Sequence, residues 1–332
     1  MTVDIGIDGV FIGHHTDVVA CTGCTIILSP GGAVASVDVR GGAPGTRETD
    51  LLSPLSSPPL VHGILLTGGS AFGLAAADGV VQYLEENGYG FDTGYARVPL
   101  VPAAVVYDLA LGRPDVRPRP EHGYTAAAAA AREVEEGSVG AGTGATVGKV
   151  RRERSWMKAG LGIAKVELPG GATVVGVSVV NAFGDVLGSD GNVLAGALAD
   201  DGSFLDTRRH LLTLDDHPHF DRMQNTTLCC VVTDAVLTKT QAASVARMAH
   251  DGMARAVSPV HTPVDGDVIF VLSCGSKRSN VFQMGSAAAR VVAQSIRRGV
   301  RQATGVGGVR ALCDLESAKA QSAMDEPSGT CT

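Results

Sequence analysis

The residues around position 226 could carry the chemistry of this chain. Asn225-Thr226-Thr227 stands directly before the apolar run 228–232, a pattern that predicts a loop leading into a buried strand. A threonine hydroxyl is a poor nucleophile at neutral pH. A threonine with a free α-amine carries its own general base, because that amine has a pKa of roughly 7.7 to 8.0. Cleavage before Thr226 would create such an amine, although an ordinary loop-to-strand junction has the same pattern.

Two carboxylates precede another strand-like run. Asp265 and Asp267 are one residue apart at the start of the apolar run 268–272. Alternation along a strand would place both side chains on one face, where they could orient a common partner. A solvated Asp-Gly-Asp turn is the alternative.

A glycine turn between a strand and a helix could bind a developing anion. The strand-length run 61–66 is followed by Thr67-Gly68-Gly69-Ser70 and then by apolar residues at helical spacing up to Leu84. Backbone amides of Gly68, Gly69, Ser70 and Ala71 would then lie at a helix start, which favours negative charge. The glycines could equally serve only close packing of the strand against the helix.

Other motifs are weaker. The segment 140–149 is glycine-rich and ends in a lysine, but its spacing does not match a phosphate-binding loop. Cys21 and Cys24 have metal or redox spacing without a second pair, so buried thiols are expected. Pairs of histidines could chelate a metal, but they are expected in surface loops; these residues are His14, His15, His217 and His219, with Asp215 and Asp216 beside the second pair. No metal and no cofactor is therefore predicted.

The remaining elements mix strands and helices. The run 21–39 reads as two strands joined at Ser29-Pro30-Gly31-Gly32, most simply a hairpin. The segment 200–224 is polar and lacks a sustained period, so we expect a long exposed connection that leads into Thr226. Further strands are predicted at 164–168, 172–180 and 268–272, and helices at 126–135, 238–256 and 287–300.

Composition limits the function. The 332 residues are 45% hydrophobic, which supports a substantial core, and the formal net charge of −7 disfavours nucleic-acid binding. No apolar run is long enough to span a membrane, and acids near the N-terminus argue against a signal peptide. Seven cysteines, an odd number, favour a reducing compartment. A cytoplasmic protein without membrane association is expected.

Several strings resemble the self-processing L-aminopeptidase/D-esterase family, which includes β-peptidyl aminopeptidases and nylon-oligomer (6-aminohexanoate oligomer) hydrolases. They occur in the family's order over nearly the whole chain, at 37–50, 66–74, 98–109, 148–149, 180–181, 225–228 and 265–267. Many aminopeptidase members have serine where this chain has Thr226. They also carry a hydroxyl residue and a glutamate where it has Asp265 and Asp267. Both features make the chain more similar to the nylon-oligomer hydrolases.

The resemblance implies an architecture and a maturation step. The family fold is an α/β protein, a four-layer αββα sandwich similar to N-terminal nucleophile hydrolases but with different connectivity. One catalytic domain would span residues 1–314, with residues 200–225 as an exposed linker and 315–332 as a disordered tail. Cleavage between Asn225 and Thr226 would give chains 1–225 and 226–332. Members commonly assemble as homotetramers of processed protomers.

The resemblance also implies roles for individual residues. Thr226 is the nucleophile, and Asn181 and Tyr107 donate hydrogen bonds to the oxyanion of the tetrahedral intermediate, although both also fit ordinary structural positions. Lys149 supplies a positive charge that steadies the oxyanion or keeps the Thr226 amine unprotonated. Asp265 and Asp267 would orient the hydroxyl and amine of Thr226. The string 41–50 receives only a structural role.

These observations predict a cofactor-independent hydrolase. Its substrates would be small peptides, β-peptides or amide oligomers, attacked through an acyl-enzyme on Thr226. One alternative is acyl transfer to an amine, as in ornithine/glutamate N-acetyltransferases, which share a self-processing threonine. Another is an unprocessed, non-catalytic ligand-binding protein with the same fold.

Overall fold

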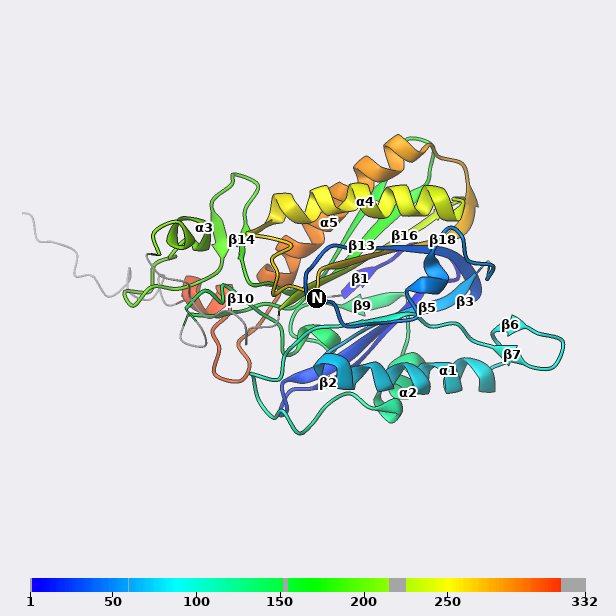
Figure 1. The fold of residues 1–332 in the computed structure, drawn as a ribbon, viewed down its shortest axis with the longest axis horizontal. Coiled ribbons are helices and arrows are strands. Elements are labelled where there is room, and N and C mark those ends of the chain that lie inside the picture. The colour runs from blue at the N-terminus through cyan, green and yellow to red at the C-terminus, as the bar shows by residue number, and fades with distance from the viewer. Residues whose placement is uncertain (1, 59, 152–154, 215–224, 318–332) are drawn as a thin grey trace, which may run out of the picture.

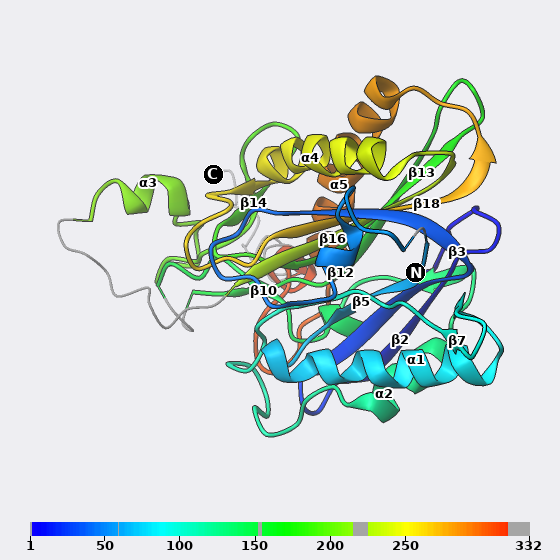
Figure 2. The same ribbon diagram turned by 45° about the vertical axis from the view of Figure 1, so that its right-hand side comes forward.

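The structure is a computed structural model that describes residues 2–58, 60–151, 155–214 and 225–317. Two β-sheets lie face to face, and a pair of helices covers the outer face of each sheet (Figure 1). The turned view in Figure 2 shows the same order of layers. The helices are α4 (Lys239–Ala256) and α5 (Val281–Arg301) on one side, and α1 (Ala76–Glu86) and α2 (Pro120–Ala128) on the other. The predicted αββα sandwich is confirmed.

The first sheet contains the strand of the candidate nucleophile. Its order is β12, β13, β16, β18 and the second part of β3, and only the β16–β18 pair is parallel. Every residue of β13 is buried, because α5 covers one face of the sheet and the second sheet covers the other. The strands are β12 (Leu161–Glu167), β13 (Thr173–Asn181), β16 (Thr226–Ala235), β18 (Val268–Lys277) and β3 (Thr22–Val39).

The second sheet carries the glycine turn. It is built from the first part of β3 with β2 on one side and β5, β8 and β4 on the other. The strands are β2 (Phe11–Asp17), β4 (Thr46–Arg47), β5 (Val61–Thr67) and β8 (Ala103–Val105). β5 confirms the strand predicted before the turn, and Gly88, with φ of 76°, follows α1 as expected for a residue just past a helix end.

β3 is one bent strand rather than the predicted hairpin. Its first part pairs with β5 and its second part with β18, and the pairing register with β5 shifts between Leu28 and Ala33. Ser29-Pro30-Gly31-Gly32 lies at this irregularity. Proline lacks an N–H group and Gly32 has φ of 89°, so the segment bends the strand from one sheet into the other without reversing it. The turn residues mark the position of the bend, but the hairpin that they predicted is wrong, because the pairing partners on each side determine the direction of the chain.

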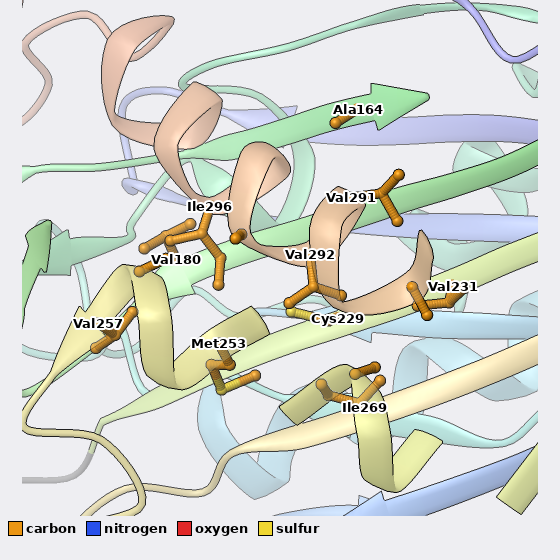
Figure 3. Packing of buried hydrophobic residues seen from close by; sticks show 14 of the residues in the cluster. Ala164, Val180, Cys229, Val231, Met253, Val257, Ile269, Val291, Val292 and Ile296 are labelled. Atoms are coloured by element: carbon orange, nitrogen blue, oxygen red, sulfur yellow. The ribbon is translucent and has the colours of Figure 1, made fainter. Parts of the chain in front are cut away.

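Three apolar clusters fill the spaces between the layers. One lies under α4 and α5, one between the sheets, and one against α1 and α2. Figure 3 shows Val292 and Ile296 of α5 and Met253 of α4 packed near Cys229 and Ile269 of the first sheet. Alternate residues of β16 enter opposite clusters, which fixes the strand that begins at Thr226 from both faces. Full burial of each aliphatic side chain contributes about 1.5–3 kcal/mol.

The helices of the first sheet agree with the sequence. Thr238 caps α4 by accepting from the backbone N–H of Gln241, as predicted from the capping-box spacing. α5 begins earlier than expected, after Asn280, whose side chain accepts from the backbone N–H of Gln283. Among the described residues, no helix combines the length and hydrophobicity of a membrane span.

The helix predicted over 126–135 is wrong in its second half. α2 ends at Ala128, and Glu133–Glu135 forms β9, which pairs with β1 (Thr2–Asp4). Only the middle residue of β9, Val134, is buried, which is the alternation of an edge strand. The alanine tract favours a helix locally, but pairing with the N-terminal segment determines the outcome.

The predicted connection before Thr226 contains a short helix, α3 (Thr207–Leu211). Thr207 is fully buried, and both its N–H and its hydroxyl donate to the carboxylate of Asp185, at 2.6 and 2.7 Å. The segment 200–214 is therefore anchored to the body of the protein. His217, His219, Asp215 and Asp216 lie outside the described residues, as does nearly all of the predicted tail 315–332.

Shorter elements complete the fold. They are β6 (Phe91–Asp92), β7 (Arg97–Val98), β10 (Thr146–Val147), β11 (Met157–Lys158), β14 (Asp185–Leu187), β15 (Val193–Ala195) and β17 (Val257–Ser258), and the 3-10 helices Asp50–Leu52, Ser70–Ala75 and Gly140–Gly142.

Candidate active site

Thr226 is the first residue of β16 and lies at the end of the first sheet. It stands directly opposite Asn181 in the β13–β16 pairing, and Asn225 forms a parallel bridge with Asp265. Thr226 is only 3% exposed, and Asn225 is equally buried. The predicted loop-to-strand junction is therefore an ordered and enclosed part of the structure.

The carbonyl oxygen of Asn225 accepts two hydrogen bonds. The hydroxyl of Thr226 donates one, and the backbone N–H of Gly266 donates the other at 2.8 Å. A hydroxyl and an amide donor thus meet at the same peptide group. Gly266 has no room for a side chain, because an added Cβ would lie 2.8 Å from the Thr226 hydroxyl oxygen. Sequence reasoning singled out the flanking aspartates and missed this glycine, although the Asp-Gly-Asp pattern contains it.

Buried Lys149 and Asn181 and the half-buried backbone of Tyr107 form one hydrogen-bonded network beside Thr226. The ammonium group of Lys149 donates to the side-chain oxygen of Asn181 at 2.7 Å and to its backbone oxygen at 3.2 Å. The side-chain NH₂ of Asn181 donates to the backbone carbonyl of Tyr107 at 3.0 Å. The structure brings all three predicted residues together, with Asn181 linking the other two.

Burial perturbs the charges of this network. It lowers the pKa of Lys149 to about 7, against the opposing effect of the Asp265 and Asp108 carboxylates. Burial, followed by the neighbouring charge of Asp267, raises the pKa of Asp265 to about 7. Both groups therefore titrate near neutral pH, as is common for groups that transfer or stabilise charge in active sites.

The two aspartates hold different parts of the chain around Thr226. Asp265 accepts from the backbone N–H of Phe183 at 3.2 Å and from the Thr262 hydroxyl. Asp267 accepts from the backbone N–H of Thr227 at 2.7 Å. The expectation that the carboxylates hold the hydroxyl of Thr226 directly has no counterpart among these contacts. Asp267 holds the residue after Thr226 in β16, and Asp265 holds the neighbouring segments at Phe183 and Thr262.

His261 completes the environment of Asp267 and was missed in the sequence. Its backbone N–H and its Nδ1 atom lie 2.9 and 2.8 Å from one carboxylate oxygen of Asp267. Its ring packs edge-on against His250, with centroids 4.8 Å apart. Nothing in the local spacing distinguishes His261, because the bent loop with φ of 55° at this residue brings it back onto Asp267.

The glycine turn forms a wall of the site. The N–H of Gly68 donates to Gly23, that of Gly69 to the Asp108 carboxylate at 2.7 Å, and that of Ser70 to Val106. Three of the four amides proposed as oxyanion donors are thus already paired within the protein. Ser70 and Ala71 instead face a cavity beside Thr226.

This cavity, which we call the acyl cavity, has a volume of about 280 Å³. Tyr107 lies in its wall, as does the segment Ala43-Pro44-Gly45, which the sequence analysis credited only with a structural role. The complete lining is Ala43, Pro44, Gly45, Ser70, Ala71, Val105, Tyr107 and Thr226. A small group bound here would lie against the Thr226 hydroxyl.

Two further buried ionisable side chains hold backbone segments, Asp108 at the glycine turn and Lys158 at the segment that contains Gly142 and Ala145. Asp108 accepts from the Thr22 hydroxyl at 2.7 Å as well as from Gly69, and burial raises its pKa to about 6. Lys158 is fully buried and donates to the backbone carbonyls of Gly142, Ala145 and Ala159, and burial lowers its pKa to about 7. Sequence reasoning missed both, since an isolated Asp or Lys carries no signal of burial.

The described residues that have metal-like spacing make structural contacts. Cys21 and Cys24 are buried free thiols. His14 and His15 lie in β2 and not in a loop; His14 binds the Thr25 hydroxyl, and His15 stacks on His122 with ring centroids 4.1 Å apart. Within the described residues, no group of three or more His, Cys, Asp or Glu side chains is arranged to hold a metal ion.

Comparison with known proteins identifies the family of the chain. Residues 4–312 match peptidase family S58. An uncharacterised aminopeptidase of Mycobacterium tuberculosis is 38% identical over 94% of this chain and 96% of the relative. A 6-aminohexanoate-oligomer endohydrolase of Kocuria sp. is 31% identical over 82% of this chain and 75% of the relative.

Solved structures share the fold. The L-aminopeptidase D-Ala-esterase/amidase of Ochrobactrum anthropi aligns with a TM-score of 0.71 at 19% identity, over 96% of this chain and 94% of that one. A Burkholderia β-aminopeptidase aligns with a TM-score of 0.68 at 20% identity, over 98% and 94%. The match to the family and the identity to its members settle the assignment: the chain belongs to peptidase family S58 and is a hydrolase of amide or peptide bonds.

Proposed function

We propose that this protein is a self-cleaving amide hydrolase whose nucleophile is Thr226. Maturation would cut the Asn225–Thr226 bond and give chains 1–225 and 226–332. The observation that carries the proposal is the pair of contacts at the Asn225 carbonyl, which combines the Thr226 hydroxyl with the N–H of Gly266.

In the maturation step the hydroxyl oxygen attacks the Asn225 carbonyl carbon. The C–N bond to Thr226 breaks, its nitrogen takes up the hydroxyl proton, and an ester joins Asn225 to the Thr226 side chain. Water then hydrolyses the ester, which leaves a carboxylate at Asn225 and a free amine and hydroxyl at Thr226. The Gly266 amide stabilises the oxyanion of this step. A single such donor is worth about 2.7–4 kcal/mol of barrier.

In turnover the new amine acts as the general base. It accepts the proton of the Thr226 hydroxyl as the oxygen attacks the substrate carbonyl, and the proton passes to the leaving amine. The positive charge of Lys149, held at Asn181, disfavours protonation of the Thr226 amine. The Tyr107 hydroxyl and the Asn181 amide are the proposed donors to the substrate oxyanion. Water finally releases the acyl group.

We further propose small peptides, β-peptides or amide oligomers as substrates. Relatives named aminopeptidase and 6-aminohexanoate-oligomer endohydrolase support this range. The size of the acyl cavity, about 280 Å³, suits a short acyl group. If amines rather than water resolve the acyl-enzyme, the protein is an acyltransferase; if no cleavage and no turnover occur, it is a binding protein.

Three features of the mature enzyme belong to the same proposal. Residues 1–314 form one catalytic domain, processed protomers assemble as a homotetramer, and the enzyme works in the cytoplasm. Free thiols at all six described cysteines, which are Cys21, Cys24, Cys229, Cys230, Cys274 and Cys313, are consistent with a reducing compartment. Light scattering of the purified protein measures the assembly directly.

Trapping of the acyl-enzyme tests the proposed chemistry. Matured protein is mixed with an activated short-chain ester, quenched in acid and measured by mass spectrometry. We expect an acyl adduct on the 226–332 chain, localised to Thr226 by fragmentation, and loss of the adduct with time in water. Hydrolysis of the ester without any adduct on the 226–332 chain would contradict the assignment of Thr226 as the nucleophile.

A further inference from the structure

The short helix α3 lies outside the four layers, beside β14 (Figure 1). The fully buried carboxylate of Asp185 in β14 holds it there. This carboxylate accepts from the N–H and the hydroxyl of Thr207 at 2.6 and 2.7 Å, and from the N–H of Ala197 at 2.9 Å. The N–H of Leu205 donates in turn to the carbonyl of Ala197 at 2.8 Å. A helix of 5 residues is not stable in isolation, so these contacts fix its position.

Two leucines of this anchored segment pack on a small apolar cluster, separate from the three clusters between the layers. This set, which we call the flanking cluster, consists of Val150, Phe183, Ala197, Leu205, Leu211 and Val264. Leu211 is half-buried in it, whereas the next residue, Leu212, is 89% exposed. α3 therefore presents one of two adjacent leucines to the cluster and the other to solvent.

The flanking cluster is directly connected to the proposed catalytic groups. Val150 follows Lys149 in the chain, and Val264 precedes Asp265. The backbone N–H of Phe183 donates to the Asp265 carboxylate at 3.2 Å. The carbonyl of Phe183 accepts from the backbone N–H of Lys149 at 2.9 Å. A shift of the cluster would therefore move both ionisable side chains.

The same cluster holds the peptide that the proposed maturation cuts. The carbonyl of Val264 accepts from the backbone N–H of Asn225 at 2.9 Å. The valine, phenylalanine and alanine of the cluster that lie nearest Lys149 and Asp185 in the chain are buried, whereas the two leucines stay partly exposed. The leucines thus lie on the solvent side of the cluster, where they complete its packing.

We propose that Leu211 is a positioning residue, which packs on the flanking cluster and so holds Lys149, Asp265 and the scissile peptide in reactive geometry. The inference rests on the proposed function, because it concerns the same threonine chemistry. Leu211 is not part of the wall of the acyl cavity, so it affects the rate of reaction and not the binding of substrate. Misplacement of catalytic groups by about 1 Å can lower a rate about 10²-fold.

Substitution of the two adjacent leucines tests this role. Leu211→Ala removes packing from the flanking cluster, and Leu212→Ala makes the same change at the exposed position. Intact-mass time courses should show that Leu211→Ala matures at least about ten-fold more slowly than Leu212→Ala, which should match the wild type. Leu211→Met conserves the volume of the side chain and should mature within about three-fold of the wild type.

A buried leucine in another layer controls for loss of stability. Leu84 of α1 is fully buried in the cluster against α1 and α2 and is not part of the flanking cluster. Leu84→Ala should lower the urea midpoint at least as much as Leu211→Ala does, and yet mature at the wild-type rate. If Leu84→Ala matures as slowly as Leu211→Ala, loss of stability explains the slowing and the positioning role is wrong.

Turnover by matured protein gives a second readout. The p-nitroanilides of an α-amino acid, of β-alanine and of 6-aminohexanoic acid represent the proposed substrate classes, and the one that the wild type hydrolyses fastest is used. Because acylation by an anilide is slow, KM approximates the dissociation constant of the substrate. Relative to Leu212→Ala, we expect kcat of Leu211→Ala to fall at least about ten-fold and KM to stay within about two-fold.

The outcomes separate this inference from the function on which it rests. Equal maturation rates and equal kcat values in Leu211→Ala and Leu212→Ala would refute the role of Leu211 and leave the self-cleaving hydrolase intact. A raised KM with unchanged kcat would also refute it. If the wild type cuts itself but hydrolyses none of the three anilides, the maturation rates decide. If the wild type neither cuts itself nor hydrolyses an anilide, the proposed function fails, and the inference fails with it.

Discussion

Substitution of Gly266 by alanine probes the contact between nucleophile and scissile peptide. The added Cβ would lie 2.8 Å from the Thr226 hydroxyl oxygen, 2.7 Å from the carbonyl oxygen of Ala43 and 3.1 Å from the Cα of Pro44. Gly266 does not have a positive φ, so alanine fits the backbone conformation and acts only through these contacts. Two of the three atoms belong to the backbone and cannot rotate away.

The geometry gives the size of the effect. Ordinary contacts begin near 3.4 Å, so Thr226 and the 266 backbone must separate by about 0.6 Å. That displacement moves the hydroxyl away from the Asn225 carbonyl and lengthens the Gly266 hydrogen bond. A misplacement of about 1 Å can cost 10²-fold in rate, and loss of one oxyanion donor costs about 10²–10³-fold. We expect maturation of Gly266→Ala to be about 10²-fold slower than that of the wild type.

Intact-mass spectrometry over a time course after purification measures this rate. Gly31→Ala is the matched control, because a Cβ at Gly31 meets no atom within 4 Å. The thermal unfolding temperature of each variant shows whether the protein is folded. A folded Gly266→Ala protein that matures at the wild-type rate would refute the assigned roles of the Gly266 amide and the Thr226 hydroxyl.

Four further predictions follow from the buried groups. Lys149→Met should slow both maturation and anilide turnover by at least about 10²-fold, because it removes the only described side-chain cation bound to Asn181; wild-type rates in either assay would exclude that role. His261→Phe removes the ring contact to Asp267 and should lower kcat, whereas His15→Phe, at a ring that stacks on His122, should leave kcat unchanged; equal kcat values in the two variants would exclude the role of His261. Thr207→Val should reduce the free energy of unfolding by about 1–3 kcal/mol in urea titrations, because the Asp185 carboxylate loses a buried donor; an unchanged midpoint would contradict this. The pKa of Lys158 is lowered to about 7 in the folded protein, so above pH 7 the unfolded chain binds more protons and this residue makes the free energy of unfolding rise with pH. The free energy of unfolding of wild type minus that of Lys158→Met should therefore increase from pH 7.5 to 9. A constant or falling value of this difference would be inconsistent with a buried lysine.

The sequence correctly predicted structural features that depend on contacts between residues close together in the chain. The capping box at Thr238, the strand before Gly68 and the glycine after α1 all involve contacts within a few residues, and all are confirmed. The long bent strand β3 and the early end of α2 depend on partners far away in the chain. Pairing across a sheet has no local signature, so propensity and turn residues gave the wrong outcome there.

In the candidate site, too, some residues could be predicted from the sequence and others depend on the folded structure. Ordered family strings named Thr226, Lys149, Asn181, Tyr107 and both aspartates, and the structure gathers them at one end of the first sheet. The backbone amide of Gly266 and the ring of His261 act through loop conformation, which no spacing rule predicts. Buried charges such as Asp108 and Lys158 are visible only once burial is known.

The central claim is that the Thr226 hydroxyl cuts its own chain and then serves as nucleophile. The most direct measurement is the denatured intact mass of purified wild-type protein beside Thr226→Ala. The account predicts two wild-type chains, 1–225 and 226–332, and one uncut, inactive chain in the variant. A wild type that remains at 33.9 kDa through prolonged incubation, or a Thr226→Ala variant that is cut at the same bond, would contradict it.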